Sequence, residues 1–549
     1  MSLLEKASII ITPTAYDVGS INAIKPIQTI GSELVTNGDF SNGSTNWSIE
    51  NTWTISNGLA SGNGANGAGA ELKQNSILPI GKKYRLTYEI KNYVSGTVKG
   101  GSGEANSGNG TYIDFFTSSR TALAFLGSNF YGDITNISVK EVVDGDLDFE
   151  RATSGSVVGT ANRENANGVL EEVAQNVPRI DYLGGAGHWL VEPQATNTAT
   201  YSNDFTQGTL FNGGGSAGVD DGILTSAQAT SPDGTNNAWK FADNNDGNSG
   251  TVTLRYFSTS VNSGDYNVVS LFVKKQGNND WFQLTPGNFD FTSAFANFNI
   301  SNGTLGTVTS DFTSANIEDY GDGWYRISAT FTSTTDVQGA IQFRLAEGDN
   351  DVTFTRDGTN GAFIYGIQAE SSTNANATKP TSYIPTSNGQ VTRAKDQFGF
   401  NTTLDTSLID STEGTFYVEM AALENDRTDR AISINNGSAT NTIWFRFRSD
   451  NGIQLRLQTS LGTTTTINTT TTTTNFIKLA ARFKTNDIAF YLNGSLVDTE
   501  TTKPAFSSNT LNTIRNSRGD TGDFFRGKIK CIAVFKEGLT DSELTCLTT

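Results

Sequence analysis

Short runs in which apolar and polar residues alternate recur along most of the chain. In Lys82–Tyr93 (KKYRLTYEIKNY), Tyr84, Leu86, Tyr88 and Ile90 fall on one face of an extended strand. Asn, Gly, Asp and Ser bound such runs, as is typical of sandwiches and barrels. No long stretch repeats apolar residues with the period of an amphipathic helix. The pattern predicts an all-β protein with several β-sandwich domains.

The clearest hairpin lies at residues 475–499 (NFIKLAARFKTNDIAFYLNGSLVDT). It predicts strands at Phe476–Phe483 and Ile488–Leu492, and the Asn-Gly pair at 493–494 is a strong signal for a two-residue hairpin turn. Further along, Thr540 is followed by Glu543. This spacing predicts a capping box at the start of a short helix.

Shifts in composition divide the chain into five parts. We expect an extended arm at residues 1–31, a jelly roll at 32–142, an extended linker or clasp at 143–196, a second jelly roll at 197–397 and a third sandwich at 398–549. The two jelly rolls open on similar sequences, NGDF at 37–40 and SNDF at 202–205, and each carries a Tyr-Gly pair near its end. These parallels predict two related domains.

The arm and the linker carry apolar residues that neither can bury alone. The arm contains the β-branched run KASIIITPTAY, and the linker contains VPRIDYLGGAGHWLVEPQATN with glycines and prolines around a tryptophan. We expect both to pair as extended edges with neighbouring chains or a partner protein. The expected anchoring and assembly residues are Ile9, Ile10, Ile11, Tyr16 and Trp189.

The net charge argues against a nucleic-acid partner, and the short length of the apolar runs argues against insertion in a membrane. The formal net charge is −18 and only 17% of residues are charged, so the chain lacks the concentrated positive face that nucleic-acid binding needs. It also lacks the run of about 18 apolar residues that a membrane span requires. We therefore expect no nucleic acid and no membrane insertion.

The chain has few of the residues that usually perform catalysis. Nucleophilic triads need a histidine as base, and His188 is the single histidine of the chain. Its surroundings predict a packed turn. The chain has too few His and Cys residues, one and two, to build a metal site from them, so no cofactor is expected. Calcium stays open at Asp243–Gly250 and Glu347–Thr353, although neither matches a twelve-residue calcium loop and a solvated acidic turn is the favoured interpretation of each. Two carboxylates suffice for glycoside hydrolysis, so 56 acidic residues leave that reaction open.

Sugar rings stack on exposed aromatic faces, which makes tryptophans the natural ligand candidates. Trp239 and Trp324 sit in apolar strand patterns and are expected in the core. Trp53 and Trp444 have more polar surroundings, although core positions are open for them too. In WFRFRSD, Arg446 and Arg448 share one strand face, where they meet sugar hydroxyls or water. The glycan-contact candidates are Trp53, Trp444, Arg446 and Arg448.

Three ordered stretches of the second jelly roll resemble modules of tailed-bacteriophage head-fibre and tail-fibre proteins: GDGWYRISATFT at 321–332, IYGIQAE at 364–370 and TSYIPTSNGQVTRAKD at 381–396. The linker is similar to a segment that precedes this module in those proteins. The start SLLEKASIIITPTAY looks like the start of such proteins in phages of Bacteroidetes. FRGKIKCIAVFKEGLTDSELTCL at 525–547 resembles the end of concanavalin A-like (laminin-G-like) sandwiches.

The resemblance implies a non-enzymatic structural protein on the exterior of a virion. In this interpretation it is a head-attached fibre or spike subunit, a homotrimer held to the capsid or another virion protein through its arm. Its lectin-like domains adhere weakly and multivalently to host-surface or environmental glycans. The alternatives are a tail fibre that binds the receptor, or a glycan-degrading enzyme with accessory binding modules.

Overall fold

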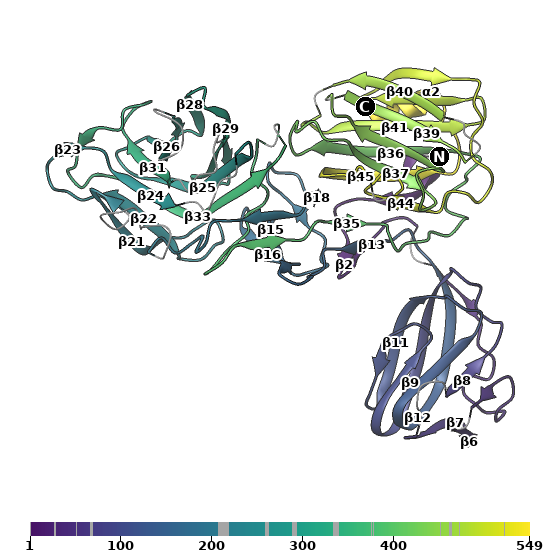
Figure 1. Cartoon of the computed structure of the whole chain (residues 1–549). Helices are drawn as coiled ribbons and strands as arrows, with labels where there is room; N and C mark the ends of the chain where they lie inside the picture. The colour runs from purple at the N-terminus through teal and green to yellow at the C-terminus, as the bar shows by residue number, and fades with distance from the viewer. Residues whose placement is uncertain are drawn as a thin grey trace.

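The computed structural model describes residues 2–26, 29–50, 52–65, 70–206, 219–257, 263–287, 294–332, 340–374, 376, 378–450, 452–460, 464–471, 473–520 and 522–549. Figure 1 shows three β-sandwiches, with the first standing apart from the other two. Almost all regular structure is strand, so the expected all-β, multi-domain architecture is confirmed.

The first sandwich is built around two long strands that pair along most of their length. Its nine strands are β4 (Thr29–Glu33), β5 (Ser48–Ile49), β6 (Trp53–Ser56), β7 (Leu59–Asn63), β8 (Glu71–Gln74), β9 (Lys83–Gly100), β10 (Ala105–Asn106), β11 (Gly110–Thr117) and β12 (Leu123–Val143). Tyr84, Leu86, Tyr88 and Ile90 of β9 are each at most 1% exposed. The alternation that predicted this strand therefore marks its buried face.

The second sandwich packs two six-stranded antiparallel sheets face to face around one apolar core. One sheet consists of β20 (Val219–Asp220), β24 (Thr253–Phe257), β31 (Ala340–Ala346), β26 (Trp281–Gly287), β27 (Ala296–Asn299) and β28 (Thr304–Val308). The other consists of β21 (Gly222–Ala229), β22 (Ala238–Asp243), β33 (Asn360–Ser372), β25 (Tyr266–Gly277), β30 (Trp324–Thr332) and β29 (Phe312–Asp319). A two-stranded ribbon is added by β23 (Ser249–Gly250) and β32 (Phe354–Thr355).

The C-terminal sandwich packs an eight-stranded sheet on a five-stranded sheet. The larger sheet holds β17 (Ile180–Asp181), β18 (His188–Val191), β45 (Gly527–Phe535), β36 (Glu413–Ala422), β41 (Ile477–Lys484), β42 (Ile488–Leu492), β43 (Ser495–Glu500) and β1 (Ala7–Ile11). The smaller sheet holds β40 (Thr464–Thr470), β39 (Gly452–Gln458), β38 (Thr442–Phe447), β37 (Arg430–Asn435) and β44 (Thr513–Arg515).

The hairpin expected from the Asn-Gly pair joins β42 to β43. Both turn residues have positive φ, 47° at Asn493 and 82° at Gly494, as a two-residue turn matched to strand twist requires. The two helices, α1 (Leu3–Lys6) and α2 (Asp541–Thr548), each begin with a capping box, and that of α2 uses Thr540 and Glu543 as expected. The described part of the chain has no helix with the length and apolar character needed to cross a bilayer.

The arm and the linker complete the larger sheet of the C-terminal sandwich. β1 pairs with β45 at residues 532–535, and β18 pairs with β45 at residues 527–529. Ile9 and Ile11 are 0% exposed and Ile10 is 6% exposed. The expectation that these isoleucines anchor a partner protein is therefore corrected. The unpaired backbone N–H and C=O groups at the edge of a strand bond to an adjacent strand, and here the adjacent strands β1 and β18 belong to the same chain.

The rest of the linker lies between the second and the C-terminal sandwich, where Figure 1 places β15 and β16. The short strands of the linker are β13 (Leu147–Glu150), β14 (Val157–Val158), β15 (Ala161–Glu164), β16 (Leu170–Val173) and β19 (Ala195–Asn197). β15 pairs with β16, β14 and β19 pair with β34 (Val391–Arg393) of the segment after the second sandwich, and β13 pairs with β35 (Gln397–Phe398) of that segment and with β3 (Ser20–Ile21) of the arm. Within the arm, β3 pairs with β2 (Tyr16–Asp17).

Candidate functional site

The outer face of the five-stranded sheet carries a group of polar side chains around one tryptophan. The apolar residues of β38 point into the core, so Trp444 and Arg446 point to the opposite side. The strand register places Arg456 opposite Trp444 and Gln454 opposite Arg446. We call the resulting group the sheet face: Trp444, Arg446, Gln454, Arg456, Thr466 and Asn468.

Arg456 has no carboxylate partner within 4 Å among the described residues, unlike Arg446. Its guanidinium carbon lies 5.3 Å from the centre of the Trp444 ring. Burial, followed by the positive charges of Arg446 and Arg518, lowers the pKa of Arg456. The sheet face therefore presents a cation whose charge is not neutralised by the protein around it.

The other polar groups of the sheet face use only part of their hydrogen-bonding capacity within the protein. Arg446 Nη1 lies 3.0 Å from Asp429 and 3.1 Å from Asp523, and Gln454 Nε2 donates to Asn468 Oδ1 at 2.8 Å. Four buried atoms form no hydrogen bond with the described part of the protein: Trp444 Nε1, Arg446 Nε, Gln454 Oε1 and Arg456 Nε. Unused hydrogen-bonding capacity at neighbouring positions is uncommon in folded proteins and needs a physical explanation.

The expected stacking of a sugar on Trp53 or Trp444 is not available in this structure. Each side chain belongs to a residue that is only 3% exposed. Trp53 packs 5.9 Å from Phe130, and its Nε1 donates to the carbonyl of Ala70 at 3.4 Å. Stacking requires an open ring face, so both tryptophans are reassigned to packing roles.

Arg448 lies just beyond β38, which ends at Phe447. Its Nη2 is 2.8 Å from Oδ2 of the exposed Asp450. Arg446 pairs with two aspartates, whereas Asp450, the carboxylate that Arg448 contacts among the described residues, is exposed to solvent. Glycan contact at Arg446 and Arg448 stays a prediction.

Trp189 fills the chain's own core instead of a neighbour's groove. It is 2% exposed, lies opposite Ile529 of β45, and packs edge-on against Tyr16 with ring centroids 6.0 Å apart. Because Trp189 is buried in the chain's own core, its expected assembly role is corrected; Tyr16 is half-buried, and its assembly role stays a prediction. His188 next to Trp189 is 1% exposed and begins β18, so it lies in a strand just after the expected turn; its Nδ1 lies 3.1 Å from the carbonyl of Ala186 and its Nε2 lies 3.2 Å from Asp181.

A buried network of charges fixes the linker to the segment after the second sandwich. Arg151 Nη1 lies 2.9 Å from Asp396, and Arg179 Nη1 lies 2.7 Å from Glu192. Arg179 also contacts Asp396, and Arg393 contacts Glu192. All five side chains are at most 3% exposed. The network joins residues more than 200 positions apart and holds three guanidinium groups with two carboxylates.

The pKa values of this network follow from its geometry. Burial alone would raise the pKa of Glu192, but Arg393 and Arg179 outweigh it and hold that pKa at about 2. Burial likewise opposes ionisation of Asp396, and the neighbouring arginines still hold its pKa below the usual range. Burial lowers the pKa of Arg151 to about 10. The carboxylates are therefore charged at neutral pH.

The two acidic turns considered for calcium use their carboxylates within the protein. Both oxygens of Asp246 accept hydrogen bonds from Arg356, at 2.9 and 2.8 Å, and Asp349 Oδ1 accepts the backbone N–H of Thr307 at 2.9 Å. Within the ranges that the structure describes, no three His, Cys, Asp or Glu side chains form a group suited to a metal ion. Calcium binding at these turns stays untested.

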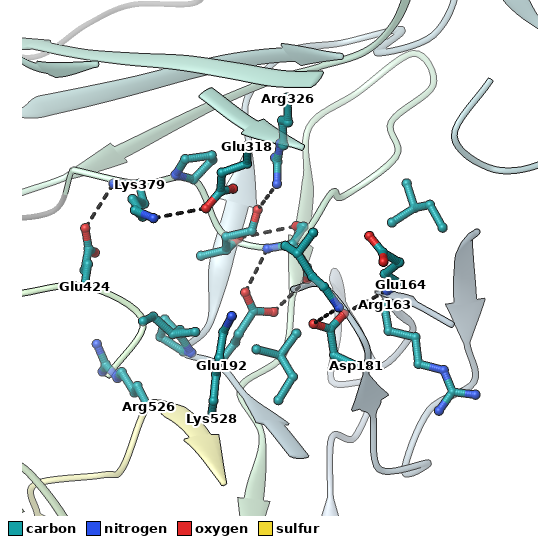
Figure 2. Close-up of a pocket in the computed structure, with 18 of the residues that line it drawn as sticks. Arg163, Glu164, Asp181, Glu192, Glu318, Arg326, Lys379, Glu424, Arg526 and Lys528 are labelled. Carbon is teal, nitrogen blue, oxygen red and sulfur yellow. Dashed lines mark hydrogen bonds and ion pairs between the residues drawn. The ribbon is translucent and has the colours of Figure 1, made fainter. Parts of the chain in front are cut away.

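A cleft opens where the linker, the second sandwich and the C-terminal sandwich meet (Figure 2). Its walls are formed by β15–β18 of the linker, by β29, β30 and residues 379–382 of the second sandwich, and by β45 with residues 423–430 of the C-terminal sandwich. The cavity between these walls has a volume of about 140 Å³ and is open to solvent. We call it the junction cleft.

Sequence reasoning missed both Arg456 and the junction cleft, for different reasons. Gln454 and Arg456 alternate with apolar residues in β39, just as Trp444 and Arg446 do in β38. The same alternation could therefore have placed Arg456 on the outer face of the sheet. The cleft instead draws on three separated segments that share no local motif.

Comparison with known families assigns the last domain. The family model of the concanavalin A-like lectin/glucanases superfamily matches residues 397–545. The C-terminal sandwich is therefore a concanavalin A-like domain, as the resemblance of its closing sequence implied. No curated protein matches the chain.

Several solved structures resemble parts of the chain. The CBM40 module of a Ruminococcus gnavus IT-sialidase, bound to alpha2,3 sialyllactose, is 16% identical, covers 25% of this chain and 83% of its own, and has a TM-score of 0.23. Domain 4 of an extracellular arabinanase from Geobacillus stearothermophilus, in complex with arabinotriose, is 14% identical over 31% of this chain and 82% of its own, with a TM-score of 0.24. At these TM-scores, no conclusion about the ligand of this chain follows.

Proposed function

We propose that this protein binds glycans without changing them chemically, and that the sheet face of its concanavalin A-like domain is the contact surface. The observation that carries the proposal is the set of polar groups on that face. Arg456 is half-buried and has no carboxylate partner within 4 Å among the described residues, and Thr466 and Asn468 beside it are exposed. Sugars offer dense hydroxyl groups that both donate and accept, which suits guanidinium and amide side chains.

Affinity at one such site is expected to be low. A small contact through partly exposed polar side chains supports dissociation constants on the order of 1 mM. Repeating the site in one particle raises the effective affinity by about 10²–10⁴ without any new contact. This makes display in many copies part of the proposed function.

The test is a glycan array probed with the full chain, followed by calorimetry on the strongest hit. Arg456→Ala removes the free cation and is expected to weaken binding at least tenfold. Arg120→Ala is the matched control, because Arg120 lies on the first sandwich and pairs with Glu71 at 2.8 Å. Equal affinity of Arg456→Ala and the unaltered protein would refute the assignment of the sheet face.

A virion location is the second part of the proposal, and attachment to the head rather than the tail is its preferred form. It is supported by the resemblance of residues 321–332, 364–370 and 381–396 to phage fibre proteins. Because Ile9–Ile11 are buried in the chain's own core, attachment has to use another surface. The first sandwich offers one, since Ile113 and Phe115 of β11 are 50% and 48% exposed. Immunogold labelling of particles distinguishes head, tail and absence.

A homotrimer is part of the same proposal. Light scattering coupled to gel filtration on the purified chain measures its mass in solution. A trimer supports multivalent display, and a monomer at micromolar concentration would contradict it.

The competing function is glycan hydrolysis, and one observation favours it. Glu164 lines the junction cleft, and burial together with the charge of Asp181 raises its pKa to about 7, as in a general acid. Hydrolysis also requires a second free carboxylate. The carboxylates on the same wall have partners, since Asp181 accepts two backbone N–H groups and Glu192 binds arginines. Release of reducing sugar from host polysaccharide would establish an enzyme.

A further inference from the structure

The junction cleft is separate from the sheet face. On the concanavalin A-like domain it lies against β45 of the eight-stranded sheet, whereas the sheet face lies on the five-stranded sheet. The cavity volume of about 140 Å³ is below the range of about 300–1,000 Å³ for drug-sized ligands, so the cleft suits at most a ligand of one sugar ring. An inference about the cleft therefore does not depend on the proposed function of the sheet face.

Most charges in the cleft walls already have protein partners. Lys379 Nζ lies 3.0 Å from Glu318, as the dashed line in Figure 2 shows, and Arg430 pairs with Asp426. Glu424 Oε2 accepts the backbone N–H of Lys379 at 3.0 Å. The two ion pairs hold the walls in place and contribute little net charge to the interior of the cleft.

Two cations on the β45 wall have no such partner. Arg526 immediately precedes β45, Lys528 is the second residue of that strand, and both side chains line the cleft. Neither forms an ion pair within the part of the chain that the structure describes, and Figure 2 draws both reaching toward the cleft without a dashed line. Burial lowers the pKa of Arg526, and no carboxylate offsets that cost. Arg526 and Lys528 are therefore two cations of the cleft wall without an ion-pair partner among the described residues.

Glu164 supplies a different group from the linker wall. Its Oε2 is buried and has no hydrogen-bond partner among the described residues. Burial, followed by the charges of Asp181 on β17 and Asp319 at the end of β29, raises its pKa to about 7, and Lys528 acts in the opposite direction. Near neutral pH, Glu164 is therefore partly protonated, and its oxygen is able to donate as well as accept.

We propose that the junction cleft binds a carboxylate-bearing sugar, with the carboxylate between Arg526 and Lys528 and a hydroxyl on Glu164. Charge-assisted hydrogen bonds to a carboxylate are about twice as strong as neutral ones, which selects an anionic over a neutral sugar. Leu190, Pro193 and Leu423 line the remainder of the cleft and suit the apolar faces of a sugar ring. The expected dissociation constant is on the order of 1 mM.

The test is calorimetry of the full chain with glucuronic acid, glucose and inorganic phosphate as separate probes. Glucuronic acid is expected to bind at least tenfold more tightly than glucose, and Lys528→Gln and Arg526→Gln are each expected to weaken it at least tenfold. Lys530→Gln is the matched control on the same strand, because Lys530 lies 4.0 Å from the Phe476 ring and does not line the cleft. Unchanged circular dichroism and melting temperature establish that each variant is folded.

The outcomes separate the possible sources of binding. Equal affinity for glucose and glucuronic acid, or no binding of either, overturns the proposal. Inorganic phosphate binding as tightly as glucuronic acid shows a simple anion site and overturns the sugar part. Loss of glucuronic acid binding in Arg456→Ala but not in Lys528→Gln places the site on the sheet face, which refutes this inference and leaves the proposed function standing.

A pH series gives a second readout for Glu164. The carboxylate of the sugar stays ionised between pH 6 and 8, while Glu164 loses its proton across that range. Deprotonation adds a negative charge near Lys528, so affinity for glucuronic acid is expected to fall several-fold as pH rises. Glu164→Gln is neutral throughout and should remove this dependence. A pH dependence that persists in Glu164→Gln contradicts the assigned role.

Discussion

Replacing Asp396 with asparagine removes one of the two carboxylates that hold three buried arginines. The change conserves shape but leaves Arg151, Arg179 and Arg393 with Glu192 as the remaining anion of the network. Arg151 and Arg179 are both 0% exposed, and both contact Asp396. An uncompensated buried charge cannot be hydrated, so breaking such a pair costs about 3–5 kcal/mol. That is a large fraction of the roughly 5–15 kcal/mol that stabilises a typical domain.

Asp322→Asn provides the matched control. Asp322 makes the same kind of contact, 2.9 Å from Lys274, but its side chain is 84% exposed. Exposed pairs contribute about 0–1 kcal/mol because water and salt screen them. The two substitutions are chemically identical, so the difference between them isolates burial.

Denaturant unfolding followed by tryptophan fluorescence measures the effect, with hydrogen exchange to locate it. Unfolding of a chain with several domains has more than one transition, so the comparison uses the transition that exposes β18 and β45. We expect Asp396→Asn to lose at least 3 kcal/mol more than Asp322→Asn. Equal losses would show that the buried network does not stabilise the junction, and the reasoning from burial would fail.

Three further predictions follow from the same contacts. Lowering the pH from about 4.5 to 2 should destabilise the junction, because the pKa of Glu192 is about 2 in the folded chain and about 4.5 in the unfolded chain. The stabilisation is present above this window and is lost as pH falls through it. Stability that does not change across this acid titration would contradict the prediction. Trp189→Ala should cost about 3–5 kcal/mol by thermal or denaturant unfolding, since the ring is 2% exposed, while glycan binding persists in the folded fraction. Removing residues 2–11 should destabilise the concanavalin A-like domain by several kcal/mol and increase its cleavage by protease, because Ile9 and Ile11 are fully buried there; a truncated domain as resistant as the full chain would refute this.

Features that depend on neighbouring residues could be predicted from the sequence. The alternation at Tyr84–Ile90 gave the buried face of β9, because successive side chains of any strand point to opposite sides. The Asn-Gly pair at 493–494 gave a hairpin turn, because Asn and Gly tolerate positive φ. Thr540 and Glu543 gave the start of α2, because capping is completed within one turn.

What the sequence left undecided was the partner of each extended segment. The run Ile9–Ile11 signalled a strand that must be covered, but the residues alone did not say whether β45 of the same chain or another protein covers it. Polarity around Trp53 and Trp444 suggested exposure, while packing across the sheets buried both. Arg526, Lys528 and Glu164 meet only because three segments converge at the junction cleft. Local chemistry determines which conformations a segment adopts, whereas burial and charge pairing depend on contacts between residues hundreds of positions apart, and only the folded chain sets those.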